Sequence, residues 1–211
     1  MTKKLFIILP LITLLFTSCE QPIEAVDIST SLDGVVINGT RWATRNVDAP
    51  GTFTQNPEDA GMLFQWNRRK GWNTVDRSVK GWDRSRARGR AWYAENDPCP
   101  EGWRVPTRRE LRRLERAVGE WVSQNGVYGR LFGIAPNQIF LPAVRVRCRD
   151  GILYHANLGN WWSGDYWSGT RFIAGPAWLL SFDNARIHYI DTSWLGGERA
   201  WGRSVRCVAI E

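Results

Sequence analysis

Histidines and paired cysteines are scarce in this chain, and their scarcity argues against most metal sites. The 211 residues contain two histidines, His155 and His188, and four cysteines, with no Cys-x-x-Cys pair. A structural zinc site needs four ligands, most of them closely spaced in pairs, and the two histidines lie far from each other and from the cysteines. The sequence therefore predicts no metal site and no cofactor.

Motifs that would identify a common enzyme class are also missing. The chain has no Gly-x-Ser-x-Gly turn, no His-Glu-x-x-His motif and no phosphate-binding glycine loop with its lysine. A scattered acidic set could supply two carboxylates as in a glycosidase, although turn residues are the favoured interpretation: Asp165, Asp183, Asp191 and Glu198. We predict that the protein is not an enzyme and has no catalytic residues, with a carbohydrate-active enzyme as the less favoured alternative.

The first residues are typical of an exported protein. Two lysines precede an apolar run over Leu5–Phe16, and small residues follow up to Cys19. Residues 1–18 are predicted to be a signal peptide, because the apolar run is too short to span a membrane. Cys19 resembles the acylated cysteine of bacterial lipoproteins, whose fatty acids, such as palmitate, would anchor the protein in the outer membrane, facing the periplasm or the cell exterior. Secretion without acylation is the alternative. Residues 19–33 are then a flexible tether.

The best turn and helix signals lie together in Asn96–Leu114. Three prolines there disfavour helical geometry in the residues before them, so Cys99–Val105 is predicted to be extended or turned. Thr107 then begins a helix, because its hydroxyl can accept a hydrogen bond from the amide of Glu110 while the Glu110 carboxylate reaches back. The apolar residues that share one face of this helix of about three turns are Leu111, Leu114 and Val118.

Apolar and alternating runs predict strands along much of the remaining chain. An Asn38-Gly39 pair predicts a β-hairpin over 34–46. Residues 62–66 are a strand or the start of a helix, and 120–133, interrupted by glycines, is predicted to be helical or irregular. Further strands are predicted in 139–148, 152–155, 177–182, 187–190 and 202–210, the last with Val205, Cys207 and Ala209 on one face. The result is one α+β domain over 34–211, with a twisted, mostly antiparallel sheet, one main amphipathic helix and long loops.

The segment Arg68–Arg90 is strongly basic. It holds nine lysines and arginines against Asp76 and Asp83, interleaved with Trp72 and Trp82. Cations with interposed aromatic rings suit an anionic polymer, and for an exported protein an acidic glycan or lipopolysaccharide is favoured over nucleic acid. A solvated loop broken by glycines is the alternative, and the modest net charge of the mature chain favours it.

Three motifs occur together in an order that is specific to one family. They are CPEGWRVPTRREL from Cys99, NLGNWWSGDYWSGT from Asn157 and GRSVRCV from Gly202. Val35–Ile210 thereby resembles the Fibrobacter succinogenes major paralogous domain, which occurs in bacterial lipoproteins and is related to C-type-lectin-like folds. The resemblance implies such a fold, a cell-surface location and a disulfide between Cys99 and Cys207, with Cys148 outside that disulfide.

Between Trp161 and Trp201 the framework residues match the family, but the residues among them depart from its usual small polar residues. Tyrosine, tryptophan and arginine dominate binding energy at interfaces, so we predict a ligand-binding face made of Tyr166, Arg171, Phe172, Arg186, His188, Tyr189, Asp191, Trp194, Arg199 and Trp201. The ligand would be a surface glycan or a protein, bound by an adhesin or receptor whose binding face, by hypothesis, is genetically diversified. Two alternatives remain open: a structural or tip subunit of a surface assembly such as a pilus, and a face whose tryptophans are core and whose arginines are merely solvated.

Overall fold

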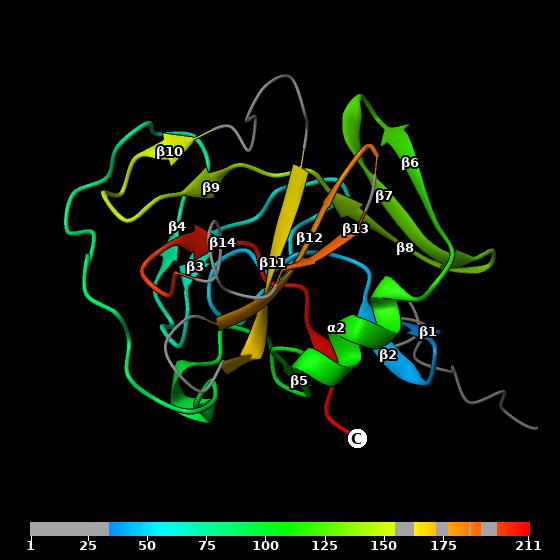
Figure 1. Ribbon diagram of the computed structural model, residues 1–211, viewed down its shortest axis with the longest axis horizontal. Coiled ribbons are helices and arrows are strands. Elements are labelled where there is room, and N and C mark those ends of the chain that lie inside the picture. Colours follow the sequence, from blue (N-terminus) through cyan, green and yellow to red (C-terminus); the bar gives the residue numbers. More distant parts are fainter. Residues whose placement is uncertain (1–33, 155–162, 172–176, 186, 191–197) are drawn as a thin grey trace, which may run out of the picture.

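The computed structural model describes residues 34–154, 163–171, 177–185, 187–190 and 198–211. These residues form four antiparallel sheets and one α-helix (Figure 1). The predicted α+β class with mostly antiparallel strands is therefore confirmed. The strands do not join into the single sheet that was predicted: consecutive strands pair with each other in small sheets, and the pairings between distant strands are those of β14 and β15.

The four sheets divide the chain as follows. The first has the order β1 (Gly34–Ile37), β2 (Thr40–Ala43), β15 (Val208–Ala209), β5 (Trp103–Arg104). The second has the order β10 (Leu153–Tyr154), β9 (Val146–Arg147), β14 (Gly202–Arg203), β3 (Leu63–Gln65), β4 (Gly71–Trp72). The third comprises β11 (Ser163–Arg171), β12 (Ala177–Asp183) and β13 (Ile187–Ile190), and the fourth β6 (Gly119–Gln124), β7 (Val127–Ile134) and β8 (Asn137–Pro142). A short 3-10 helix, η1, spans Ala94–Asn96.

Two local predictions are confirmed closely. The β1–β2 hairpin turns at Asn38 and Gly39, whose φ angles of 48° and 74° are those that an Asn-Gly turn supplies at low cost. The helix α2 (Arg108–Glu115) begins with the predicted capping box between Thr107 and Glu110. Residues 62–66, predicted to be a strand or the start of a helix, contain the strand β3.

The helix is shorter than predicted. Leu111 and Leu114 are buried as expected, but α2 ends at Glu115 and Val118 is 65% exposed. Ala117 donates its amide to the Leu114 carbonyl in a closing turn, and Gly119 already belongs to β6. Strand pairing therefore ends the helix after about two turns.

The prediction of a helical or irregular piece over 120–133 is wrong. This region forms the β6–β7 hairpin, which turns at Asn125 and Gly126 with positive φ angles. The glycines that suggested a break permit close strand packing instead. A side chain at Gly129 would place its Cβ only 2.4 Å from the carbonyl oxygen of Leu141 on β8.

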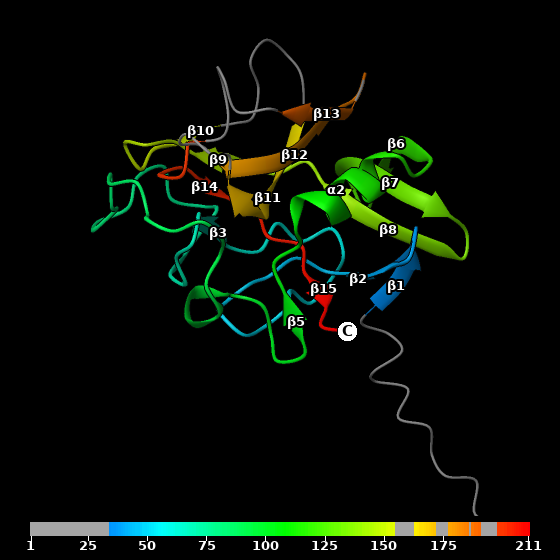
Figure 2. The same cartoon turned by 60° about the horizontal axis from the view of Figure 1, so that its bottom comes forward.

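The C-terminal segment is not one continuous strand. β14 pairs with β3 and β9, whereas β15 pairs with β2 and β5, so the segment passes from one sheet to another. The residues between them are buried, and their carbonyl groups accept hydrogen bonds from backbone amides that are distant in the sequence. The Ser204 carbonyl accepts from Trp167, that of Val205 from Val47, and that of Cys207 from Ala43. The terminal segment thus joins the sheets (Figure 2).

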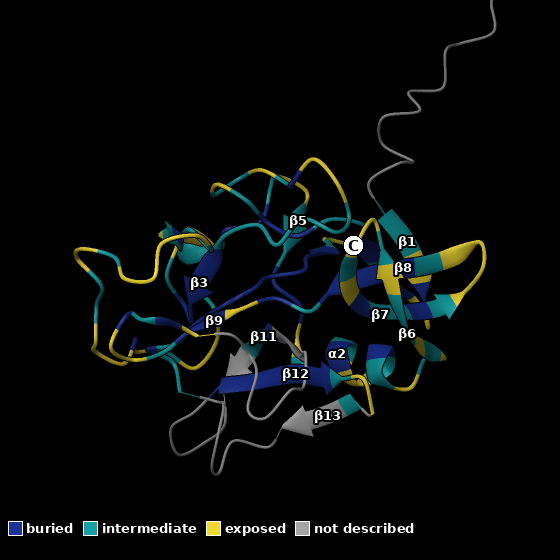
Figure 3. Cartoon of the chain, turned by 90° about the horizontal axis from the view of Figure 1, so that it is seen from above, coloured by how far each residue is buried: buried dark blue, intermediate teal, exposed yellow. Residues whose placement is uncertain are grey.

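Two clusters of buried apolar residues form the core, one around Trp66, Trp167 and the disulfide, the other around Trp42, Leu111 and Phe182. β12 has six consecutive buried residues; it pairs with β11 and β13 and contacts α2 (Figure 3). The implied disulfide Cys99–Cys207 is present and closes a loop with a sequence separation of 108. In the chain-entropy model such a loop stabilises the fold by about 4 kcal/mol.

One prediction concerns the thiols. After denaturation without reductant, alkylation should label Cys148 and leave Cys99 and Cys207 unlabelled, because those two are bonded to each other. Peptide mass mapping before and after reduction measures this directly. Label on Cys207 without reduction would contradict the pairing.

A second prediction concerns the capping box. Burial raises the pKa of the Glu110 carboxyl, but hydrogen bonds from Arg104 and Thr107 outweigh it and lower that pKa below its ordinary value. The stabilisation is therefore fully present above the ordinary pKa and is lost as the pH falls through the lowered one. Glu110→Gln should reduce the free energy of unfolding by about 1–2 kcal/mol at pH 7.

Urea unfolding of both chains at pH 7 and pH 3 measures this loss, which should shrink at pH 3. Glu115→Gln at the far end of α2 is the matched control and should change little at either pH. An equal loss for Glu110→Gln at the two pH values would show that the carboxylate charge is not responsible.

Candidate binding site

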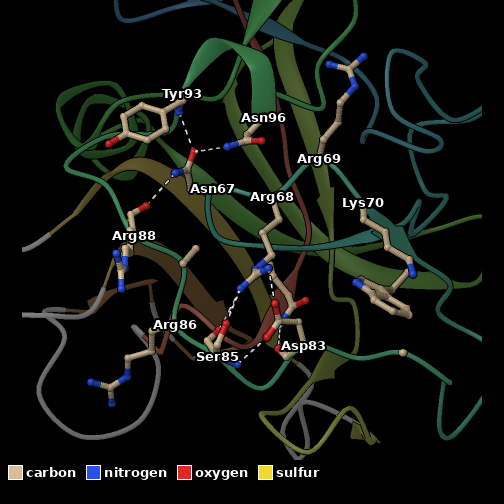
Figure 4. Close-up of a pocket in the computed structure, with 14 residues that line it drawn as sticks. Asn67, Arg68, Arg69, Lys70, Asp83, Ser85, Arg86, Arg88, Tyr93 and Asn96 are labelled. Carbon is tan, nitrogen blue, oxygen red and sulfur yellow. Dashed lines mark hydrogen bonds and ion pairs between the residues drawn. The ribbon is translucent and has the colours of Figure 1, made fainter.

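An open pocket lies over the basic segment that follows β3. Its cavity volume is about 700 Å³, and its walls come from residues 65–72 and 81–96 (Figure 4). In Figures 1 and 2 this part of the chain lies on the opposite side of the molecule from α2 and β1. The lining is basic, with Arg68, Arg69, Lys70, Arg86 and Arg88 against the single acid Asp83.

A buried amide holds the two walls together. Asn67 follows β3 with a φ of 56°, a left-handed conformation that asparagine tolerates better than most residues. Its Nδ2 donates to the carbonyl of Arg88 at 2.9 Å, and its Oδ1 accepts from the backbone amide of Tyr93 at 2.7 Å. The side-chain amide of Asn96 donates to the same oxygen at 3.4 Å. One side chain thereby positions three residues of the opposite wall.

The floor of the pocket is a neutralised cluster. Arg68 forms an ion pair with Asp83 and donates to the hydroxyl of Ser85 at 2.9 Å. Hydrogen bonds from Ser85, followed by the charge of Arg68, lower the pKa of Asp83. Gln65 donates to the carbonyls of Asp83 and Ala200, which ties this floor to the C-terminal segment.

The five cations fall into two groups. Arg68 pairs with Asp83, and Arg86 makes a bidentate pair with Glu198, at 2.8 Å from Nε to Oε1 and 2.6 Å from Nη2 to Oε2. These hydrogen bonds raise the pKa of Arg86. The other three cations form no ion pair within the described part of the chain. They are Arg69, which donates to the Asp97 carbonyl, Lys70, whose Nζ lies 4.1 Å from the centroid of the Trp72 ring, and Arg88.

Two aromatic rings line the pocket in different ways. Trp72 is buried, with the Lys70 ammonium on its ring and Trp82 packed 5.0 Å away between centroids. Tyr93 is 44% exposed and its ring lies across Gly89. A Cβ at Gly89 would lie 2.9 Å from Cζ of Tyr93, and the glycine φ of 118° excludes most other residues. The tyrosine ring thus packs on the Gly89 backbone and keeps part of its surface in solvent.

The predicted C-terminal binding residues are only partly placed. Tyr166 departs from the prediction, because its side chain is 1% exposed and its hydroxyl donates to the Pro142 carbonyl in the core. Arg199 and Trp201 are half-buried; the Arg199 guanidinium lies 5.3 Å from the Trp66 ring, and Trp201 lies 5.1 Å from the Arg203 guanidinium. Arg171 ends β11, and His188 and Tyr189 lie in β13 opposite Ser181 and Leu180. Phe172, Arg186, Asp191, Trp194 and the lipidation candidate Cys19 lie outside the described residues.

The C-terminal segment nevertheless reaches the pocket. Glu198 pairs with Arg86, the Arg199 carbonyl accepts from the Trp66 amide, and the Ala200 carbonyl accepts from Gln65. The basic residues are conspicuous in the sequence, but no local pattern predicts these contacts, because Arg86 and Glu198 are 112 positions apart. Asn67, Tyr93 and Asn96 were missed for the same reason.

Comparison of the chain with protein-family models, with curated proteins and with solved structures finds no match. Within the described ranges, no helix is long and apolar enough to cross a membrane. The same ranges contain no group of three or more histidine, cysteine or acidic side chains that could hold a metal ion. The site must therefore be interpreted from its own chemistry.

We expect Asn67→Gly to loosen the pocket wall. Glycine accepts the positive φ, so the change removes only the amide bonds and leaves the buried groups without partners, at a cost of about 1–3 kcal/mol in the free energy of unfolding. Urea unfolding measures the loss. Asn38→Gly, which removes an exposed amide at another positive φ, is the control and should cost less. A smaller loss at Asn67 than at Asn38 would contradict this structural role.

Proposed function

We propose that this protein is a non-catalytic, ligand-binding protein of the cell surface and that its pocket takes an anionic ligand. The observation that carries the proposal is that Arg69, Lys70 and Arg88 line one open cavity and form no ion pair within the described residues. A cavity lined by several cations has a positive potential, which attracts an anion and which a bound anion would reduce.

The remaining lining suits binding as well. Asn67, Asn96 and Ser85 offer polar groups near the cations, and Tyr93 offers an exposed ring. Asp83 is the one carboxylate in the described lining, and it is already engaged with Arg68. A glycosidase would need two carboxylates facing each other across the site, so the pocket favours recognition over hydrolysis.

The surface location and the finer fold belong to the same proposal. The leader and Cys19 support export and lipid anchoring in the outer membrane, and the three sequence motifs support a C-type-lectin-like domain. The α+β architecture and the Cys99–Cys207 bond agree with such a domain. In this proposal the chain around Glu198 and Arg199 borders the basic pocket, because Glu198 pairs with Arg86 of the lining and the Arg199 guanidinium lies 5.3 Å from the ring of Trp66, next to the lining residues Gln65 and Asn67. The function would be adhesion to an anionic surface molecule.

The binding experiment uses dextran sulfate as a polyanion and uncharged dextran as its control. The purified exported protein should bind the first, less tightly as salt rises, and should not bind the second. The double variant Arg69→Gln/Arg88→Gln should weaken binding about tenfold or more, since it removes two unpaired charges of the pocket. Titration calorimetry measures both affinities.

Arg109→Gln/Arg116→Gln on α2 is the matched control, because it removes the same charge from two exposed arginines outside the pocket. It should leave binding within about twofold, as expected for charges that act only through the long-range field. Equal losses in the two double variants would show that net charge rather than the pocket binds the polymer. An unchanged affinity in the pocket variant would overturn the proposal.

A further inference from the structure

We infer that the ligand of the pocket is an acidic polysaccharide, whose sugar rings pack on Tyr93 while its carboxylates meet Arg88 and Lys70. This inference rests on the proposed function and names the chemical class of the ligand. Its basis is that one open cavity is lined by a partly exposed aromatic ring and by cations that form no ion pair within the described residues.

Tyr93 is built as a contact surface. Its backbone amide donates to Asn67, and its ring packs on Gly89, where a Cβ would lie 2.9 Å from Cζ of the ring. The ring therefore has a packing surface in the protein, although nearly half of the residue stays exposed. An aromatic side chain has few rotatable bonds and loses little entropy on binding, so its apolar face can contribute to affinity.

The cations lie at two ends of the cavity. Arg88 lies near Tyr93, since the Asn67 side chain bonds to the backbone of both residues. Lys70 lies at the other end, above the ring of Trp72 (Figure 4). A ligand that uses the whole pocket must be extended and must carry negative charge at intervals.

The combination of groups distinguishes between extended polyanions. Polyphosphate is charged along its length but has no apolar face for Tyr93. Single-stranded nucleic acid is bound through successive stacked bases and so favours several open rings, whereas the other ring of this pocket, Trp72, is buried. A chain of uronic acids has an apolar ring face, hydroxyls for the amides and regularly spaced carboxylates. It matches the lining best.

The test compares oligogalacturonate with polyphosphate and oligo-dT, using the purified exported protein and calorimetric titration. Tyr93→Leu keeps an apolar side chain but removes the ring, and Tyr93→Phe keeps the ring. We expect Tyr93→Leu to weaken oligogalacturonate binding about fivefold and to leave polyphosphate binding unchanged. Tyr93→Phe should retain at least half of the original affinity. Thermal unfolding of each variant checks that the fold is intact.

The outcomes separate this inference from the function on which it rests. If dextran sulfate binds through Arg69 and Arg88 but oligogalacturonate binds no better than polyphosphate, the anion site stands and the polysaccharide assignment fails. The same holds if Tyr93→Leu weakens both polymers equally, or if oligo-dT binds most tightly. If none of the polyanions binds, the proposed function itself fails.

Discussion

The buried guanidinium of Arg206 is the interaction on which the arrangement of the sheets depends. It is 1% exposed and donates to Asn46 Oδ1 at 2.9 Å, to the Ala43 carbonyl at 3.1 Å and to the Phe140 carbonyl at 3.0 Å. Those acceptors belong to β2, to the chain just after it and to β8. One side chain thus joins two sheets to the C-terminal segment.

The charge of Arg206 makes these contacts obligatory. Burial lowers the pKa of its guanidinium to about 10, so the group stays protonated at neutral pH and the cost of burying the charge is present there. That cost would decline only as the pH rises past this value. Removing acceptors from a buried charge costs about 3–5 kcal/mol, so the three groups must stay in place. The neighbouring Cys207 is bonded to Cys99, and together the two residues hold the terminal segment between the sheets.

The position of the terminal segment in turn shapes the pocket. β14 pairs with β3, which leads directly into Asn67, and Trp66 is held by the Arg199 carbonyl and, through its indole N–H, by the Ser168 carbonyl. Glu198 then neutralises Arg86 at the rim. Arg68 and Arg86 are thus neutralised by carboxylates, whereas Arg69, Lys70 and Arg88 form no ion pair within the described residues. Uncompensated like charges destabilise a fold slightly, and a binding role gives a reason to keep them.

Interactions within a few residues could be predicted from the sequence by itself. The Asn38-Gly39 turn and the Thr107–Glu110 capping box each depend on local geometry, and both formed as expected. The second Asn-Gly turn, at 125–126, carried the same signal but was obscured by the surrounding glycines. The resemblance carried by three sequence motifs implied the Cys99–Cys207 pairing, which spacing by itself could not.

Only the tertiary structure decided how distant segments meet. It divided the terminal run between two sheets, because Ser204–Cys207 pair with residues far away in the chain. It placed Tyr166 in the core, and it brought Asn67, Arg88, Tyr93 and Glu198 around one cavity. A sequence shows which residues carry charge or an aromatic ring. Which charges form ion pairs depends on packing across the whole fold. Of the five cations that line the pocket, two form ion pairs and three form none within the described residues.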